Sequence, residues 1–153
     1  ARARLDILLE NTDRVNFGPA LPGERVGLLN GVMLAGHPLT GWQNYSLPML
    51  TPAQLHDSTK PCSGPCFYRG TFTIDKPADT FLDTSSISKG EVWINGRPLG
   101  RAWNIGPEKT LYLPAPWLHA GQNNILVFDL NSGGAPQLRG LNHPILNGTA
   151  VSH

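Results

Sequence analysis

The amino-acid sequence predicts an all-β protein, a β-sandwich of the jelly-roll kind. Short runs of β-branched, aromatic and alternating apolar residues recur about every ten residues along the chain. The 153 residues include 17 glycines and 14 prolines, which end strands and form tight turns. Only 15% of the residues are charged, and no stretch keeps the apolar period of an amphipathic helix.

The first part of the chain is expected to hold four short strands. Leu5, Ile7 and Leu9 repeat at every second position, which is typical of a strand with one buried face. Asn30-Gly31 is a hairpin signal between the second and third strands. The expected strands are residues 4–10, 25–29, 32–34 and 42–47, and one helical turn is expected at residues 51–54.

The second part of the chain carries stronger strand signals. The run at 124–130 is almost wholly apolar, so we expect it at the centre of a sheet. Trp117 follows two prolines, which favours a single 3₁₀ turn at 116–118. The other expected strands are residues 66–74, 80–83, 91–95, 99–103, 110–113 and 140–146, with the first strand as a partner for the last.

The stretch at 89–103, KGEVWINGRPLGRAW, is the feature around which the chain is organised. Asn95-Gly96 tolerates the positive φ angles of a type I′ turn, so the chain is expected to fold back there. The returning strand would deliver Arg101 and Trp103 to its end. One hypothesis is that this guanidinium and indole grip a sugar. The other is that the stretch is an ordinary sandwich hairpin whose Trp packs in the core.

Length and charge limit the classes of protein to which the chain can belong. A chain of 153 residues predicts one domain, residues 1–153, with its own core. A net charge of +1 without a basic run argues against a nucleic-acid partner. No apolar stretch approaches the ~20 residues that span a bilayer, so no membrane partner is expected. Asp6 and Glu10 interrupt the apolar start, which therefore reads as a cut inside a longer polypeptide rather than a signal peptide.

Cys62 and Cys66 are the two cysteines, and three residues separate them. A disulfide that closes a small loop is the favoured interpretation, and free thiols are the alternative. A disulfide would place the protein in an oxidising compartment. A zinc site would lack ligands, so no metal site is predicted from these residues.

The sequence shows no self-contained active site. Its eleven acidic residues are scattered, whereas a glycosidase needs two carboxylates facing each other across the scissile bond. The five histidines lie far apart, and the Gly-x-Ser-x-Gly motif of many serine hydrolases is missing from the sequence. Catalysis by this chain alone is therefore not expected.

Several aromatic residues lie beside predicted turns or strand ends, where rings can stack on the C–H face of a sugar. Taken singly, such an aromatic more often packs in the core or at its rim than it binds a ligand, and Trp93, in mid-strand, is expected in the core. Asn44 and Asn147 begin short matches to the N-glycosylation pattern. The aromatic candidates are Trp42, Tyr45, Trp103, Tyr112 and Trp117.

Longer segments resemble the C-terminal β-domain of glycoside hydrolase family 35 β-galactosidases. They are LDILLENTDRVNFG, CFYRGTFTI, DTFLDTSSISKGEVWINGRPLGRAWNIGPEKTLYLPAPWL and GQNNILVFDL. The resemblance implies a galactose-binding-like jelly roll whose catalytic partner, a separate TIM barrel, lies N-terminal to it. The chain departs from the family wording at Ala102, where an aromatic is usual, at Ile87, where Trp is usual, and at Glu108, where Gln is usual. Fewer rings would weaken a stacking platform.

Three functions are then open. The first is a carbohydrate-binding module for galactosides or plant polysaccharide chains, with Asn95 as a further hydroxyl-bonding group. The second is a structural module that docks on the catalytic barrel, and the third, a complete enzyme, lacks paired acids. A structural Ca²⁺ is a side expectation, and an extracellular or periplasmic location follows from polysaccharide substrates. The predicted carbohydrate-binding residues are Arg101, Trp103, Asn104, Trp117, Trp42 and Tyr45.

Overall fold

The computed structural model describes residues 3–11, 16–19, 21–47, 55–56 and 58–146. The chain divides into two compact units, Ala1–Ser46 and Leu47–His153, and each is described by itself. The prediction that residues 1–153 form one domain stays a prediction. The expected helical turn at 51–54 and the glycosylation match that begins at Asn147 lie outside the described residues.

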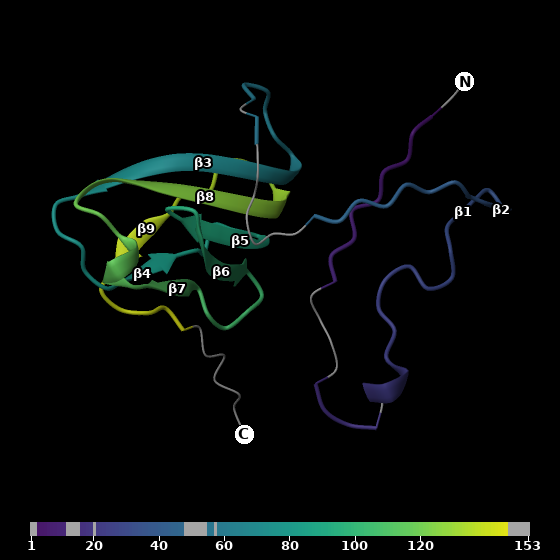
Figure 1. Cartoon of the computed structure of the whole chain (residues 1–153), viewed down its shortest axis with the longest axis horizontal. Helices are drawn as coiled ribbons and strands as arrows, with labels where there is room; N and C mark the ends of the chain where they lie inside the picture. Colours follow the sequence, from purple (N-terminus) through teal and green to yellow (C-terminus); the bar gives the residue numbers. More distant parts are fainter. Residues whose placement is uncertain (1–2, 12–15, 20, 48–54, 57, 147–153) are drawn as a thin grey trace. The chain divides into compact units, whose positions relative to one another are not determined.

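The second unit is a sandwich of two antiparallel sheets (Figure 1). A four-stranded sheet has the order β3-β8-β5-β6, and a three-stranded sheet has the order β7-β4-β9. The all-β prediction is confirmed, and β8 lies inside its sheet as expected. The elements are β3 (Gly64–Ile74), β4 (Thr80–Asp83), β5 (Lys89–Ile94), β6 (Arg97–Trp103), β7 (Thr110–Leu113), the 3₁₀ turn η2 (Ala115–Trp117), β8 (Gly121–Ser132) and β9 (Arg139–Leu141).

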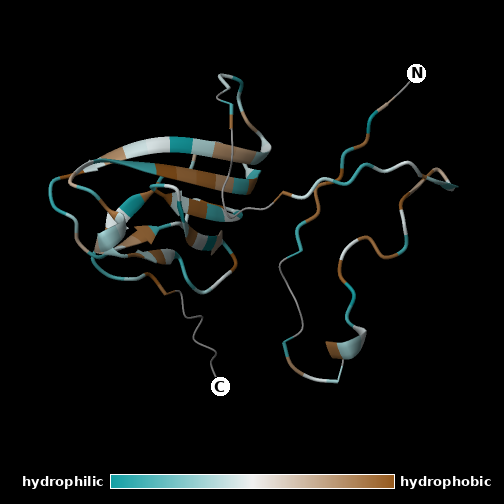
Figure 2. Cartoon of the chain, viewed as in Figure 1, coloured by the Kyte–Doolittle hydropathy of each residue, from teal (hydrophilic) through white to brown (hydrophobic). Residues whose placement is uncertain are grey.

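The core lies between the inner faces of the two sheets. Val92, Ile94 and Val127 from the four-stranded sheet pack with Leu82 and Leu113 from the three-stranded sheet. Figure 2 shows the hydrophobic run along β8 that supplies part of this core. Successive side chains of a strand point to opposite faces. The alternation therefore also determines which residues of β5, β6 and β8 face away from the core.

The central hairpin forms as predicted. Asn95 and Gly96 have φ angles of 50° and 78°, the left-handed conformation that a type I′ turn requires. The pairing of β5 with β6 then runs from Ile94 opposite Arg97 to Lys89 opposite Trp103. Trp93 is buried, with 1% of its surface exposed. It lies on the outer side of β5, with its ring centroid 6.4 Å from that of Phe67.

The first unit differs from its prediction. It contains η1 (Leu21–Gly23) and a short hairpin of β1 (Met33–Leu34) with β2 (His37–Pro38). Residues 4–10, 25–29 and 42–47, all described, form no strand, so those three predictions are wrong. A strand needs a neighbour that supplies hydrogen bonds as well as an alternating pattern. These segments have the pattern without the neighbour, and their leucines are exposed.

The prediction of a last strand at residues 140–146, paired with the first strand, is also wrong. β9 covers Arg139–Leu141 and pairs with β4, not with the start of the chain. Beyond it, the described residues make a single bridge between Glu108 and Leu146. Pro144 interrupts the segment, and because proline cannot donate to a ladder it shortens the strand.

Candidate functional site

The outer face of the four-stranded sheet carries the residues on which the sequence prediction centred. Phe67 is opposite Phe128, Phe128 is opposite Glu91, and Glu91 is opposite Arg101. Ala102 is buried in the core, so its neighbour Arg101 faces outward. The ring centroids of Phe67 and Phe128 are 4.8 Å apart. One row across the sheet thus holds two rings, a carboxylate and a guanidinium.

Trp103 lies at the end of β6 beside this row. Lys89 is its partner on β5, and the Lys89 Nζ atom is 4.2 Å from the centre of the indole ring. The ammonium group stabilises the ring orientation through a cation–π contact. Since 37% of Trp103 is exposed, part of its ring remains open to a ligand. A sugar that stacked there would meet a fixed indole next to positive charge.

Asn104 begins a loop that is tied down through its backbone. Its N–H donates to the Ser88 carbonyl oxygen at 2.9 Å, and its carbonyl oxygen accepts a hydrogen bond from Lys109 Nζ. The Gly106 N–H donates to the Trp103 carbonyl oxygen at 2.9 Å. The backbone of Asn104 therefore has a fixed position next to Trp103, and its side chain is exposed there. Arg101, Trp103 and Asn104 are brought together as expected from their closeness in sequence.

Trp117 lies elsewhere. It packs half-buried against the core, and the Arg97 guanidinium carbon is 5.7 Å from its ring centre. Strands rise about 3.3 Å per residue, so Arg97 and Trp103 are about 20 Å apart along β6. Trp117 and Trp103 therefore lie at opposite ends of this strand, too far apart for one small sugar ring to touch both.

Trp42 and Tyr45 belong to the first unit. Both are exposed, and each side chain makes a local hydrogen bond. The Trp42 Nε1–H donates to the Leu39 carbonyl oxygen at 3.0 Å, and the Tyr45 hydroxyl donates to Gln43 Oε1 at 2.9 Å. Their ring faces are available for contact in that unit.

Asn95 has an internal role in place of the hypothesised hydroxyl-bonding one. Its Nδ2 donates to the Trp117 carbonyl oxygen at 2.8 Å and to Asn123 Oδ1 at 2.9 Å. Its Oδ1 accepts from the Asn124 N–H at 2.9 Å. Both ends of the amide are engaged, so Asn95 joins the hairpin turn to η2 and β8.

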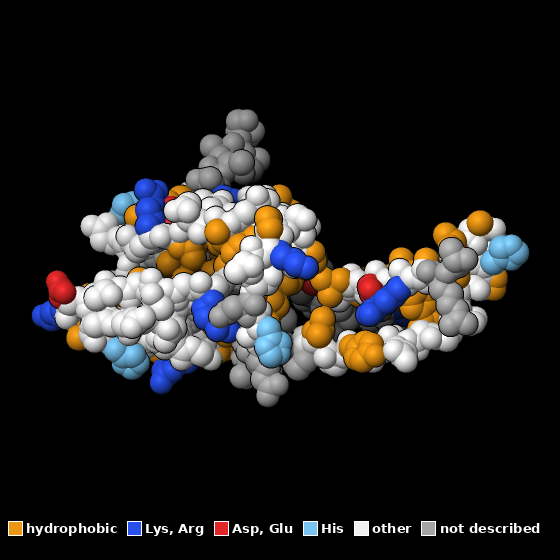
Figure 3. Space-filling view, turned by 90° about the horizontal axis from the view of Figure 1, so that it is seen from above, with side chains coloured by type: hydrophobic (Ala, Val, Ile, Leu, Met, Phe, Trp, Pro, Cys, Tyr) orange, Lys and Arg blue, Asp and Glu red, His pale blue; other side chains and the backbone are white. Residues whose placement is uncertain are grey.

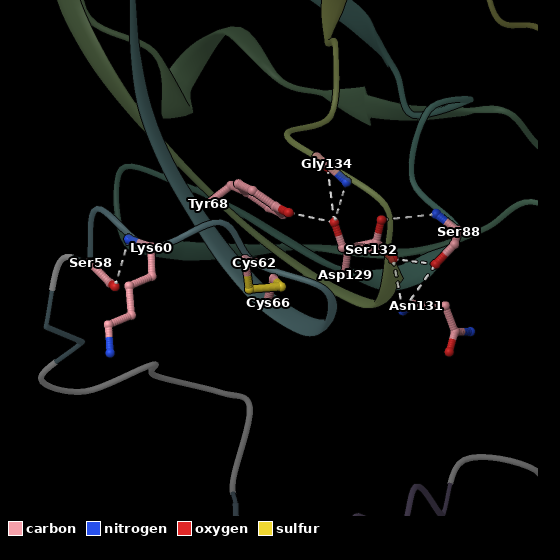
Figure 4. The surroundings of a disulfide bond; sticks show 10 residues. All are labelled: Ser58, Lys60, Cys62, Cys66, Tyr68, Ser88, Asp129, Asn131, Ser132 and Gly134. Carbon is pink, nitrogen blue, oxygen red and sulfur yellow. Dashed lines mark hydrogen bonds between the residues drawn. A yellow bond between two sulfur atoms is a disulfide. The ribbon is translucent and has the colours of Figure 1, made fainter.

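Asp129 is a residue whose importance the sequence analysis missed. Its buried carboxylate accepts hydrogen bonds from the backbone N–H groups of Ser88 and Asn131 and from the Ser88 hydroxyl (Figure 4). It also accepts one from the Lys89 N–H. Backbone donors offset the cost of burying the charge. Because Asp129 holds the start of β5, it positions Lys89 and, through it, Trp103. A lone acid inside the apolar run at 124–130 was the available signal.

The disulfide lies at the start of β3 (Figure 4). Cys62 and Cys66 are bonded, with Cα atoms 6.1 Å apart. Nearby, the Tyr68 hydroxyl and Ser132 Oγ share a hydrogen bond, and Ser132 Oγ donates to the Gly134 carbonyl oxygen at 2.9 Å. These contacts stabilise the end of the β3–β8 pair.

Across the described ranges, no three His, Cys, Asp or Glu side chains converge in a way that could hold a metal ion. Within the same residues, no helix has the length and apolar character needed to cross a bilayer.

Two family models match the chain. Residues 65–123 match the β-galactosidase galactose-binding domain, and residues 1–48 match the first all-beta domain of β-galactosidase. The range that matches the galactose-binding domain contains Arg101, Trp103, Asn104 and Trp117. The range that matches the first all-beta domain contains Trp42 and Tyr45.

Individual relatives agree with these models. A β-galactosidase of Xanthomonas manihotis is 48% identical over 110 residues, which cover 71% of this chain and 18% of the relative. Human β-galactosidase-1-like protein 2 is 41% identical over 85% of this chain and 22% of its own length. β-Galactosidase 1 of Dictyostelium discoideum is 40% identical over 82% of this chain and 20% of its own. The chain spans about a fifth of the length of the relatives it matches.

Proposed function

This chain belongs to the β-galactosidase family through its galactose-binding and first all-beta domains, and from that premise we propose that it is a non-catalytic carbohydrate-binding module. Its ligands are galactosides or plant polysaccharide chains, bound weakly. Residues 1–153 together form an accessory β region, and bond cleavage belongs to the catalytic barrel of the parent enzyme. The disulfide agrees with an extracellular or periplasmic location.

The observation that carries this proposal is the open surface formed by Arg101, Trp103 and Asn104. Small-ligand sites combine apolar or aromatic faces with a few fixed polar groups. Trp103 supplies the ring, and the Arg101 guanidinium and Asn104 amide supply hydrogen bonds for hydroxyl groups. The hairpin and the Asp129 contacts fix the backbone of these residues, and Lys89 contacts the Trp103 ring, before a ligand arrives. Trp117 would contact a longer chain at a separate point of the same unit, and Trp42 and Tyr45 would offer contacts within the first unit.

Titration of the isolated chain with galactose, lactose and a soluble galactan tests the proposal. We expect saturable binding at millimolar sugar and at least about tenfold weaker binding for Trp103→Ala. Phe17→Ala is a matched control, because it removes an exposed ring from the first unit. If titration with millimolar sugar gave no heat and no chemical-shift change, the proposal would be rejected.

A second candidate function is docking on the catalytic barrel. Phe67 and Trp103 are each 37% exposed on the outer face of one sheet, and Figure 3 shows further hydrophobic side chains at the surface of the sandwich. Tryptophan and arginine dominate the energetics of many protein interfaces. Adding the barrel would then raise the melting temperature of this chain, and Trp103→Ala would weaken that effect without changing sugar affinity.

A further inference from the structure

The outer face of the three-stranded sheet carries a second aromatic pair. Phe81 on β4 is opposite Tyr112 on β7, and their ring centroids are 5.6 Å apart with planes at 57°. Leu82 and Leu111, the next pair along, pack in or against the core, so Phe81 and Tyr112 face away from it. Tyr112 is 52% exposed, which leaves much of its ring open.

The segment after β9 forms a wall beside this pair. The Lys109 N–H donates to the Ile145 carbonyl oxygen at 3.0 Å, and the Ile145 N–H donates to Thr110 Oγ1 at 3.2 Å. Leu146 bridges to Glu108. A shallow depression results, lined chiefly by Phe81, Tyr112, Pro144 and Leu146, with Glu108 and Thr110 as its polar groups.

The hydroxyl of Tyr112 is already engaged outside the depression. It donates to the Asp79 carboxylate, which raises the pKa of Tyr112. Asp79 also accepts a hydrogen bond from the Ala115 N–H at 2.7 Å, and this contact and the one from Tyr112 lower the pKa of Asp79. The tyrosine is thus fixed at its hydroxyl end, so it presents the face of its ring and not its polar tip.

We propose that this depression is a second carbohydrate-contact site, in which a hexopyranose stacks its C–H face on Tyr112 and donates a hydroxyl hydrogen bond to the Glu108 carboxylate. The inference rests on the proposed function and adds a second binding site to it. A concave, partly apolar surface with a fixed aromatic ring and few polar groups suits a sugar. Phe81, Glu108 and Tyr112 all fall within the range matched by the galactose-binding model. The site lies on the other sheet from Trp103, so one polysaccharide chain or two separate ones could use both.

A titration of the ¹⁵N-labelled full chain with galactose and lactose, followed by NMR, tests this inference. We expect chemical-shift changes in β4, β7 and residues 144–146 as well as around Trp103. Tyr112→Ala should remove the first set and leave the second, and Trp103→Ala should do the reverse. Tyr112→Phe keeps the ring but lacks the hydroxyl that donates to Asp79, so it should retain the shifts with affinity reduced several-fold. Phe17→Ala should leave both sets unchanged.

The outcomes separate this inference from the proposed function. Shifts around Trp103 alone would overturn the second site and leave the carbohydrate-binding function standing. Shifts in β7 that persist in Tyr112→Ala would also overturn it, because the ring is the main contact. The absence of any shift would reject the proposed function and the second site together.

Discussion

At the residue scale, two buried polar side chains hold the hairpin and the surface beside it. Asn123 is fully buried and makes four hydrogen bonds, to Asn95, to both backbone groups of His119 and to the Gly121 carbonyl oxygen. Asp129 is also buried, and its carboxylate accepts hydrogen bonds from the backbone at the start of β5. Both side chains are buried and so are not exposed to a ligand. Their role is to fix the backbone from which Arg101 and Trp103 extend.

Asn123→Ala should destabilise the protein by about 2–4 kcal/mol, because it removes four hydrogen bonds of a fully buried side chain and leaves part-buried backbone groups of His119 without these partners. Urea denaturation followed by tryptophan fluorescence measures this change in the free energy of unfolding. Asn124→Ala is the matched control, since the neighbouring side chain is exposed. Equal stability of the two variants would show that the Asn123 network contributes little.

Acid should weaken the fold through Asp83. Hydrogen bonds from Ser85, and the Arg139 guanidinium with its N–H donor at 2.9 Å, hold the pKa of Asp83 below its ordinary value of 3.8. A carboxyl with a lowered pKa in the folded state contributes stability above its unfolded pKa and loses it as the pH falls through the folded pKa. We therefore expect the urea concentration at the unfolding midpoint to decrease as the pH is lowered beneath about 4. The decrease should be less steep for Asp83→Asn. If the urea midpoint depended on pH in the same way in both proteins, this role of Asp83 would be contradicted.

At the scale of elements, strand prediction succeeded where a segment had its hydrogen-bonding partner in the chain. Residues 80–83 and 110–113 match β4 and β7 residue for residue, because alternation, turn residues and pairing agree there. Residues 4–10 show the same alternation and form no strand, since sequence pattern alone does not supply a neighbour. The same limit applies to the site. Arg101, Trp103 and Asn104 were predictable as neighbours, whereas the separation of Trp117 and the pairing of Phe81 with Tyr112 depend on strand order.

Gly90 should tolerate no side chain, because β5 and β8 approach closely there. A Cβ atom at Gly90 would lie 1.7 Å from the Phe128 carbonyl oxygen, a backbone atom that cannot rotate away. Gly90→Ala should cost more than about 3 kcal/mol or prevent folding. Gly70→Ala, whose Cβ would lie 3.4 Å from a flexible Ile125 methyl group, should fold nearly normally. Circular dichroism melting curves compare the two, and similar melting temperatures would refute the close approach.

Reduction of the Cys62–Cys66 bond should have a modest effect. The closed loop is short, with a sequence separation of 4, so the chain-entropy estimate of its stabilisation is about 2 kcal/mol. Cys62→Ser should lower the melting temperature and keep the fold, since β3 is held to β8 along its whole length. Unfolding of this variant at room temperature would show that the disulfide carries far more of the stability.

At the scale of the whole molecule, the backbone amides of the two units should differ in their protection against hydrogen exchange. Leu47–His153 contains the paired sheets and the core, whereas the described part of Ala1–Ser46 contains one two-residue hairpin and several exposed leucines. Amides in β8 and β5 should therefore exchange with deuterium orders of magnitude more slowly than amides at 4–10. Equal protection of the backbone amides in both units would contradict this difference between the described residues of Ala1–Ser46 and the paired sheets of the second unit.

We propose that this β-galactosidase-family chain contacts carbohydrate through Trp103 and its neighbours. Affinity electrophoresis of the purified chain through a gel containing soluble galactan tests it most directly. We predict that the chain is retarded relative to a galactan-free gel, that Trp103→Ala is retarded less, and that Phe17→Ala migrates like the parent chain. Identical migration of the parent chain in both gels would contradict the claim.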